Sequence, residues 1–398
     1  MLPAPVIFQE RLAARGVSIV ADHGESMRRR TIIRAAPLVL AAPAIARAQD
    51  VLRSGATAYR LVTLARDLEQ PWSIAFLPDG RLLVTERPGR LRVFANGRLE
   101  PRPLAGVPAV VSSGQGGLLD VCLHPDFARN RLLYLSYAGD GSGGAATMVA
   151  RAELADGGLA RTAPIFTALP RAGGGLHFGS RLAFDRAGLL YVTTGERYQR
   201  ERAQDLRDLG GKVVRLRDDG SVPPDNPFVG RPDARPEIFT FGHRNPQGLA
   251  MHPVTGRMWE AEHGPRGGDE LNLLVAGANY GWPRATHGVD YSGAVISPHK
   301  SLPGMQDPVR AWVPSISPCG LAFYTGDAFP AWKGSLFTGA LSNQALFRIE
   351  LDGERWYREE RLLADRLPYI RDVRQGPDGL IYLVTHAEDG GLYRLEPA

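Results

Sequence analysis

Polar side chains that could do chemistry occur at four separate places, each at or just before a short apolar run. His177 lies in "GGGLHFGSRLAF", Arg244 and Asn245 in "GHRNPQGLAMHP", Gln115 in "GQGGLLDV" and Arg371 in "YIRDVRQGPDG". The ordinary pKa of histidine, near about 6.5, makes His177 a candidate general base at neutral pH. The planar guanidinium of Arg244 suits a fork to a carboxylate or a carbonyl oxygen. Each residue taken alone also has a structural explanation: a core histidine, an ion pair or a turn cap.

Pro246 constrains the residue directly before it, Asn245. Proline pushes the residue before it into extended backbone and cannot donate to a sheet ladder. We therefore expect Arg244 and Asn245 on a rim loop where a strand begins, with side chains free for a ligand. Gln115 lies beside Gly114, Gly116 and Gly117. Glycines allow close approach of a ligand to the backbone, so this amide is a further candidate contact.

A glycine-rich loop, "EHGPRGGDELNLLVAGANYGWP" (262–283), carries Glu262, Asp269 and Glu270. Hard cations bind carboxylate and backbone carbonyl oxygens, and calcium is the ion favoured for this loop. A solvated acidic loop is the alternative. The sequence has no Cys/His cluster with the spacing typical of a zinc site.

Six hairpin-like segments must position these residues. Each has an apolar strand, a turn usually rich in Pro, Asp or Gly, and a second apolar strand. They span 74–86, 120–137, 181–196, 248–264, 320–341 and 372–387. Several second strands are apolar on successive residues, which is typical of sheets covered on both faces.

The spacing of these hairpins leaves room for four strands per repeat, and no stretch after residue 48 has a sustained helical period. The sequence therefore predicts an all-β fold, a six-bladed β-propeller of four-stranded antiparallel blades. Residues 59–68 and 391–397 could complete one blade together. A two-domain array of β-sandwiches is the alternative. Arg374 stands where the other five repeats have an apolar residue.

The positive charge is concentrated at the N-terminus. The formal net charge of the chain is +5, and residues 1–48 contribute +4 of it, because they contain seven Arg and three acidic residues. Residues 49–398 have no long basic run. Nucleic acid is therefore not an expected partner. "MRRRTIIRAAPLVLAAPAIARAQD" resembles a twin-arginine export signal after upstream sequence, so we expect residues 1–48 to be removed and residues 49–398 to form one periplasmic catalytic domain. We expect no membrane-spanning segment. We also expect Cys122 and Cys319 to be buried free thiols and not a disulfide.

Several motifs, in order, resemble those of the soluble PQQ-dependent aldose sugar dehydrogenases, relatives of soluble quinoprotein glucose dehydrogenase. They are "GQGGLLDV", "HFGSRLAFD", "GKVVRLRDDGSVPPDNPF", "GHRNPQGLAMHP", "EHGPRGGDELN", "NYGWP" and "IRDVRQGPDG". The resemblance covers residues 59–397 and implies a six-bladed propeller that oxidises aldoses at the anomeric carbon to lactones. It implies PQQ and Ca²⁺ as cofactors, an external electron acceptor and a monomer or homodimer.

The resemblance also implies individual roles. His177 matches the proton acceptor, and Arg244 would stabilise charge that grows on the quinone oxygen. The matched PQQ-binding positions are Gln115, Arg244, Asn245, Tyr291, Ala340, Leu341 and Arg371. The backbone carbonyls of Gly264 and Pro265 match ligands of the catalytic calcium, and Glu270 and Tyr280 match a second, structural calcium site.

Two positions depart from the family pattern. Ser342 stands where relatives commonly carry Lys, and Tyr369 where they commonly carry Arg. PQQ has three carboxylates, so we expect weaker cofactor binding than is usual in the family. Arg374 or Lys333 are candidates to compensate. Two alternative functions are considered. A calcium-dependent propeller lactonase or esterase would share the fold and the metal, but it does not explain why Gln115, His177, Arg244 and Asn245 occur together. A non-catalytic binding propeller is favoured if the cofactor was lost.

Overall fold

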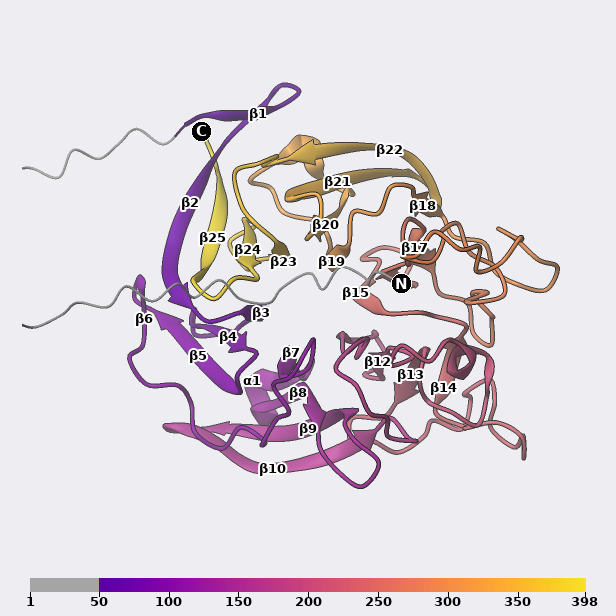
Figure 1. Cartoon of the computed structure of the whole chain (residues 1–398). Helices are drawn as coiled ribbons and strands as arrows, with labels where there is room; N and C mark the ends of the chain where they lie inside the picture. Colours follow the sequence, from indigo (N-terminus) through magenta and orange to yellow (C-terminus); the bar gives the residue numbers. More distant parts are fainter. Residues whose placement is uncertain (1–49) are drawn as a thin grey trace, which may run out of the picture. The chain divides into compact units, whose positions relative to one another are not determined.

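The computed structural model describes residues 50–398. The predicted export signal lies outside the described residues. The described part is built almost wholly of strands, in six antiparallel sheets arranged around a common centre (Figure 1). The predicted six-bladed propeller is therefore confirmed.

Each of the six predicted hairpins forms the two inner strands of one sheet. The first sheet contains β3 (Pro71–Phe76), β4 (Leu82–Glu86), β5 (Arg90–Ala95) and β6 (Arg98–Leu99). The second contains β7 (Leu118–Leu123), β8 (Leu132–Gly139), β9 (Ala146–Ala155) and β10 (Gly158–Thr167). The third contains β11 (Leu182–Phe184), β12 (Leu190–Thr194), β13 (Lys212–Leu216) and β14 (Ile238–Phe241).

The remaining three sheets follow the same plan. The fourth contains β15 (Pro246–Met251), β16 (Met258–Glu262), β17 (Asp269–Leu273) and β18 (Arg310–Trp312). The fifth contains β19 (Pro318–Phe323), β20 (Leu336–Ala340), β21 (Ala345–Asp352) and β22 (Arg355–Leu362). The sixth contains β23 (Ile370–Gln375), β24 (Ile381–Thr385), β25 (Gly390–Pro397), β2 (Thr57–Leu68) and β1 (Leu52–Ser54).

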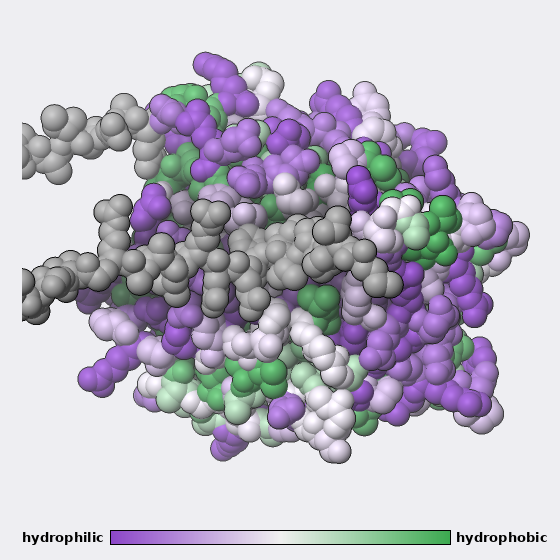
Figure 2. Space-filling model, in the orientation of Figure 1, coloured by the Kyte–Doolittle hydropathy of each residue, from purple (hydrophilic) through white to green (hydrophobic). Residues whose placement is uncertain are grey.

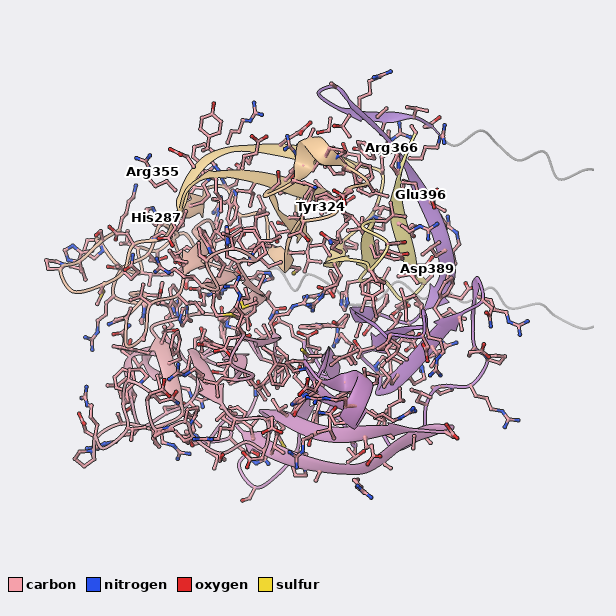
Figure 3. The ribbon with its side chains drawn as sticks, turned by 180° about the vertical axis from the view of Figure 1, so that it is seen from behind. His287, Tyr324, Arg355, Arg366, Asp389 and Glu396 are labelled. Carbon is pink, nitrogen blue, oxygen red and sulfur yellow. The ribbon has the colours of Figure 1, made fainter. Side chains whose placement is uncertain are left out.

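The two ends of the described chain close the ring, as expected from the sequence. β2 pairs with β25 in antiparallel register, from Tyr59 opposite Pro397 to Leu68 opposite Gly390. The short β1 makes this sheet five-stranded, a small departure from the predicted four. Outside β1, Asp50 pairs with Arg366, which lies at the periphery close to β2 (Figure 3).

The core consists of apolar clusters between adjacent sheets. Every one of the six interfaces has such a cluster, because residues of neighbouring sheets interdigitate. In β4 and β24 all the residues are buried. Sheets that are covered on both faces need this continuous apolar pattern. Polar residues cover most of the face seen in Figure 2, with small apolar patches between them.

Helical structure is limited to short turns. In residues 50–398 it comprises α1 (Phe127–Asn130) and two 3₁₀ segments, η1 (Arg200–Gln204) and η2 (Pro330–Trp332). No helix in this range is long and apolar enough to cross a membrane. Both cysteines in it are free thiols, as expected; Cys319 is buried and Cys122 half-buried.

A buried ion-pair network joins the inner strands and explains why Arg374 breaks the apolar pattern. Arg374 donates from Nε to Oδ2 of Asp372 at 2.9 Å and from Nη2 to Oδ1 of Asp120 at 3.0 Å. Arg181 donates from Nη1 to Oδ1 of Asp372 at 2.9 Å. Arg181, Asp120 and Asp372 are almost completely buried. The network therefore links the second, third and sixth sheets through charge-assisted hydrogen bonds.

Candidate active site

The candidate residues lie at the beginnings of inner strands. Gln115 precedes β7, His177 precedes β11, Arg244 and Asn245 precede β15, and Arg371 is the second residue of β23. Because the inner strands neighbour one another around the centre, their starting loops gather at one end of the ring (Figure 1). The four distant segments therefore meet, as the propeller prediction requires.

His177 is held rigidly by three partners. Its backbone N–H donates to Oε1 of Gln115 at 2.9 Å, and its Nδ1 lies 2.8 Å from Oε2 of Glu196. Its φ of 51° is in the left-handed region, which is uncommon for a residue other than glycine. Tyr198 packs edge-on against the imidazole, with ring centroids 5.3 Å apart. The ring is thus fixed in both position and orientation.

Glu196 determines which nitrogen of His177 can accept a proton. A carboxylate at Nδ1 favours the tautomer that carries its hydrogen there, which leaves the Nε2 lone pair for a ligand. Burial, together with the nearby Arg244 cation, lowers the pKa of His177 below its ordinary 6.5, while Glu196 acts in the opposite direction. The imidazole is therefore neutral at pH 7, which a general base must be.

Arg244 is fixed by backbone oxygens and by a carboxylate. Its Nη1 donates to the carbonyl oxygens of His263 at 3.0 Å and Gly264 at 2.6 Å, and its backbone N–H donates to Oε2 of Glu262 at 2.5 Å. The guanidinium carbon lies 5.4 Å from the ring centroid of Trp282. Arg244 thus presents a fixed positive charge close to His177, as the sequence predicted for a residue on a rigid loop.

Asn245 and Gln115 mainly order their surroundings. Oδ1 of Asn245 accepts hydrogen bonds from the backbone N–H of Gly179 at 3.1 Å and from Nε2 of Gln247 at 3.2 Å. Gln115 is exposed; its side-chain Oε1 accepts from the His177 N–H, and its backbone N–H donates to the carbonyl oxygen of Gly175 at 2.6 Å. Both amides therefore tie the loop of His177 to neighbouring blades.

Three adjoining cavities contain most of the candidates. The first is lined by Glu196, Tyr198, Arg244, Pro265, Trp282 and Tyr291. The second is lined by Trp72, Gln115, Asn245, His263, Leu341 and Arg371. The third is lined by Arg244, Glu262, His263, Gly264, Glu270 and Tyr280. Arg244 is shared by the first and third, and His263 by the second and third, so the three form one region. Ala340 is buried at the end of β20, beside Leu341.

The cation Arg371 lines the second cavity, and the cation Arg87 lies near Arg371. Arg371 donates from Nη1 to Oε1 of Gln247 at 2.9 Å, and its buried Nε has no partner in residues 50–398. Arg87 donates to the carbonyls of Gly116, at 2.9 Å, and Gly114. Burial and the neighbouring Arg371 lower the pKa of Arg87 to about 10. Within the described range neither guanidinium forms an ion pair. An anion with several carboxylates fits this donor set, because it would neutralise both cations.

Arg374 and Lys333 do not supply the missing cations, so that suggestion is wrong. Arg374 is committed to the buried network with Asp120 and Asp372, and Lys333 pairs with Asp327 at the surface. Ser342 is exposed, and its Oγ bonds to Oγ of Ser317 at 3.0 Å. Arg87 is the additional cation beside Arg371, and sequence reasoning did not single it out.

The loop after β16 presents carbonyl oxygens to this region. The carbonyl of Gly264 already accepts from the Arg244 cation, and that of Pro265 accepts from Oγ of Ser315 at 3.3 Å. A side chain at Gly264 would place Cβ 2.2 Å from the carbonyl oxygen of Gly268, so only glycine fits there. Asp269 orders the loop, since Oδ1 accepts from the Gly264 N–H at 2.8 Å. Hard carbonyl oxygens with carboxylates nearby fit a calcium ion.

Glu196 is the main functional residue that sequence reasoning missed. It ends the third predicted hairpin and is 1% exposed, and its backbone N–H donates to the carbonyl oxygen of Arg244 at 3.0 Å. A carboxylate at the end of an otherwise apolar strand was the available signal. Trp282, in "NYGWP", and His263, in "EHGP", lay inside quoted motifs but were not selected.

The loops of the six-bladed propeller thus bring a histidine–carboxylate pair and several buried arginines together. The model of the family "Glucose / Sorbosone dehydrogenase" matches residues 68–394. The chain belongs to this family. The predicted family and the predicted class of enzyme, an oxidoreductase, are thereby confirmed.

Three relatives illustrate the likeness. The chain is 46% identical over 337 residues to the aldose sugar dehydrogenase YliI of Escherichia coli K12, covering 83% of this chain and 91% of that protein. The apo crystal structure of the soluble aldose sugar dehydrogenase of E. coli superposes with a TM-score of 0.83 at 44% identity, covering 85% of this chain and 100% of that one. The PQQ-bound aldose sugar dehydrogenase of Streptomyces coelicolor gives a TM-score of 0.72 at 30% identity, covering 88% and 98%.

Proposed function

We propose that this protein oxidises aldose sugars at the anomeric carbon to lactones, with PQQ and calcium as cofactors and an external electron acceptor. The observation that carries the proposal is the pairing of His177 with Glu196, whose backbone N–H bonds to the carbonyl oxygen of Arg244; Glu196 and Arg244 both line the first cavity. The names of the E. coli and S. coelicolor relatives support the substrate class and the cofactor.

His177 acts as the general base on the anomeric hydroxyl. Its Nε2 takes the hydroxyl proton, since Nδ1 is engaged by Glu196. The Glu196 carboxylate then stabilises the imidazolium that forms. The aromatic rings of Tyr198, Trp282 and Tyr291 in the first cavity provide apolar surface for the faces of a sugar. Loss of the proton leaves an alkoxide, from which hydride departure is favourable.

Residues around the first and second cavities would hold PQQ. They are Gln115, Arg244, Asn245, Tyr291, Ala340, Leu341 and Arg371, with Arg87 as a further cation behind the loop of Gln115. When bound, PQQ supplies a two-electron acceptor for hydride. Arg244 provides positive charge close to His177, where negative charge develops.

Calcium would be held at two places on the walls of the first and third cavities. The carbonyls of Gly264 and Pro265 would hold the ion that polarises the cofactor, and Glu270 and Tyr280 a structural ion. Their position on the walls of cavities that also contain Arg244 supports this assignment.

The cellular setting follows from the N-terminal sequence alone. We propose export by the twin-arginine route, removal of residues 1–48 and activity in the periplasm, where electrons pass to the external acceptor. A monomer or homodimer is expected.

A dye-reduction assay tests the proposal. Purified protein should reduce dye with an aldose only when PQQ and Ca²⁺ are both added, and the lactone should appear in equal amount. The matched control is Glu354→Gln, a surface change on the side of the propeller. Dye reduction without PQQ, or lactone hydrolysis without sugar oxidation, would contradict it.

A further inference from the structure

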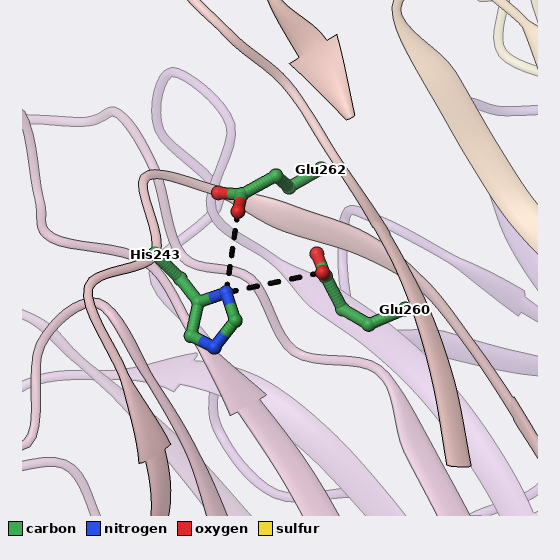
Figure 4. Close-up of side chains that lie close together, drawn as sticks. All are labelled: His243, Glu260 and Glu262. Atoms are coloured by element: carbon green, nitrogen blue, oxygen red, sulfur yellow. Dashed lines mark hydrogen bonds and ion pairs between the residues drawn. The ribbon is translucent and has the colours of Figure 1, made fainter. Parts of the chain in front are cut away.

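A cluster of buried ligand-type side chains lies behind Arg244 and shares Glu262 with the site described above. His243, Glu260 and Glu262 are at most 3% exposed, and their ligand atoms lie within 4.8 Å of one another (Figure 4). Nδ1 of His243 lies 3.2 Å from Oε1 of Glu262 and 3.8 Å from Oε2 of Glu260. Ligands of a metal ion bound at about 2.0–2.2 Å are separated by about these distances.

The register of the fourth sheet concentrates negative charge at this point. Across β16 and β17, Glu260 is opposite Asn272 and Glu262 is opposite Glu270, so four polar side chains share one face. Like charges directly opposite each other are destabilising. The Glu262–Glu270 pairing is therefore unfavourable unless a proton or a metal ion lies between the two carboxylates.

The hydrogen bonds of the cluster are incomplete in a way that indicates a cation. Nδ2 of Asn272, which has two hydrogens, faces three carboxylate oxygens at 3.1–3.4 Å. Within residues 50–398, Oδ1 of Asn272 and Oε1 of Glu260 have no partner although both side chains are fully buried. Exchanging the amide oxygen and nitrogen of Asn272 would turn Oδ1 toward the carboxylates, which is favourable only around a positive ion.

The outer contacts of the ligands are those of a metal site. Nε2 of His243 lies 2.9 Å from Oγ1 of Thr240, so it can donate there and leave Nδ1 as a lone pair. Oε2 of Glu262 accepts from the backbone N–H of Arg244, which leaves Oε1 facing the cluster. His243 also stacks on Tyr280, with centroids 4.6 Å apart. Glu262, one of these ligands, also lines the third cavity together with Glu270.

We propose that His243, Glu260 and Glu262 bind a buried Zn²⁺ ion, with the amide oxygen of Asn272 as the fourth ligand. One imidazole with oxygen ligands suits zinc, whereas calcium takes six to eight oxygens. The site adjoins the calcium position expected at Glu270 and Tyr280, since Nδ2 of Asn272 lies 3.4 Å from Oε2 of Glu270 and His243 stacks on Tyr280. Because Glu262 also holds Arg244, the ion would stiffen the loop that carries the catalytic arginine.

Metal analysis tests this without reference to activity. The whole chain is stripped with EDTA, incubated with Zn²⁺ in a large excess of Ca²⁺, and passed over a sizing column before elemental analysis. The proposal predicts one equivalent of zinc in the wild type and in the surface control Glu354→Gln, and at least tenfold less in Glu260→Gln. No zinc in the wild type, or full zinc in Glu260→Gln, would overturn it.

A crystal of the zinc-loaded wild type decides the matter if Glu260→Gln does not fold, as judged by circular dichroism. An anomalous peak at the zinc edge is expected between the three side chains. A peak only elsewhere would overturn the proposal, and so would calcium at that position. These results do not depend on sugar oxidation, because they are measured without sugar or PQQ.

Discussion

The side-chain carboxylate of Glu196 lies 2.8 Å from Nδ1 of His177. The backbone N–H of the same residue donates to the carbonyl oxygen of Arg244. One residue therefore couples the candidate base to the cation that lowers its pKa. This arrangement allows the contributions of charge and position to be separated by substitution.

Glu196→Gln should change the pH profile in a defined direction. Glu196 raises the pKa of His177, so its neutral replacement lowers that pKa further, and the acid limb of kcat/KM moves to lower pH. The rate at neutral pH should fall by about 10²-fold because the imidazolium loses its counter-charge. Steady-state dye reduction between pH 4 and 9 measures both effects. The control is Glu237→Gln, which neutralises a carboxylate paired with Arg235. If the acid limb of the Glu196→Gln profile moved to higher pH, the account would be contradicted.

Arg371→Met should weaken cofactor binding much more than a surface change does. The buried cation has no carboxylate partner in the described part of the chain, so a bound anion is expected to provide one. Removing one member of such a pair costs about 2 kcal/mol or more, which is roughly 30-fold in Kd. Titration of the apo-protein with PQQ, followed by fluorescence, measures it. Arg355→Met, at the outer edge in Figure 3, is the control; equal Kd values for both variants would argue against this cavity.

Ser342→Lys should strengthen PQQ binding. Ser342 follows Leu341, which lines the second cavity, and its exposed position can accommodate a longer side chain. A partly exposed cation contributes at most about 1 kcal/mol, or a few-fold in Kd. The same titration applies, with the exposed Ser301→Lys as control. Weaker binding by Ser342→Lys would show that the departure from the family pattern has another cause.

Asp372→Asn should destabilise the propeller. Asp372 accepts from Arg181 and Arg374 and is 0% exposed. The substitution leaves two buried guanidinium groups without one of their carboxylate partners, which lowers the free energy of unfolding by about 3–5 kcal/mol. Asp352→Asn, which breaks an exposed pair with Arg355, should cost at most about 1 kcal/mol. Urea unfolding compares the two variants, and similar midpoints would refute a structural role for the network.

The fold could be predicted because its signals are local and repeated. Each hairpin carries its own apolar strands and turn, and six copies in one chain limit the architecture. Closure by residues 59–68 and 391–397 followed from their strand-like pattern. The function of Arg374 could not be predicted, because its partner Asp120 is 254 residues away.

The site was predicted only in part. His177 and Arg244 lie in motifs with distinctive glycines and a proline. Glu196 and Arg87, in contrast, follow ordinary apolar strands, and their roles depend on contacts with other loops. The proposed zinc cluster could be predicted only in part for the same reason. The alternation of side chains along β16 and β17 predicts that Glu260 and Glu262 share a face, but it does not predict that His243 approaches them from the third blade.

The central claim is that His177 removes a proton from the sugar. The most direct test is kcat/KM of His177→Gln at pH 7, measured with PQQ and Ca²⁺ at saturating concentrations shown by titration to be bound. The account predicts a fall of at least about 10²-fold with cofactor affinity nearly unchanged. Wild-type turnover by this variant, with the cofactor bound, would contradict it.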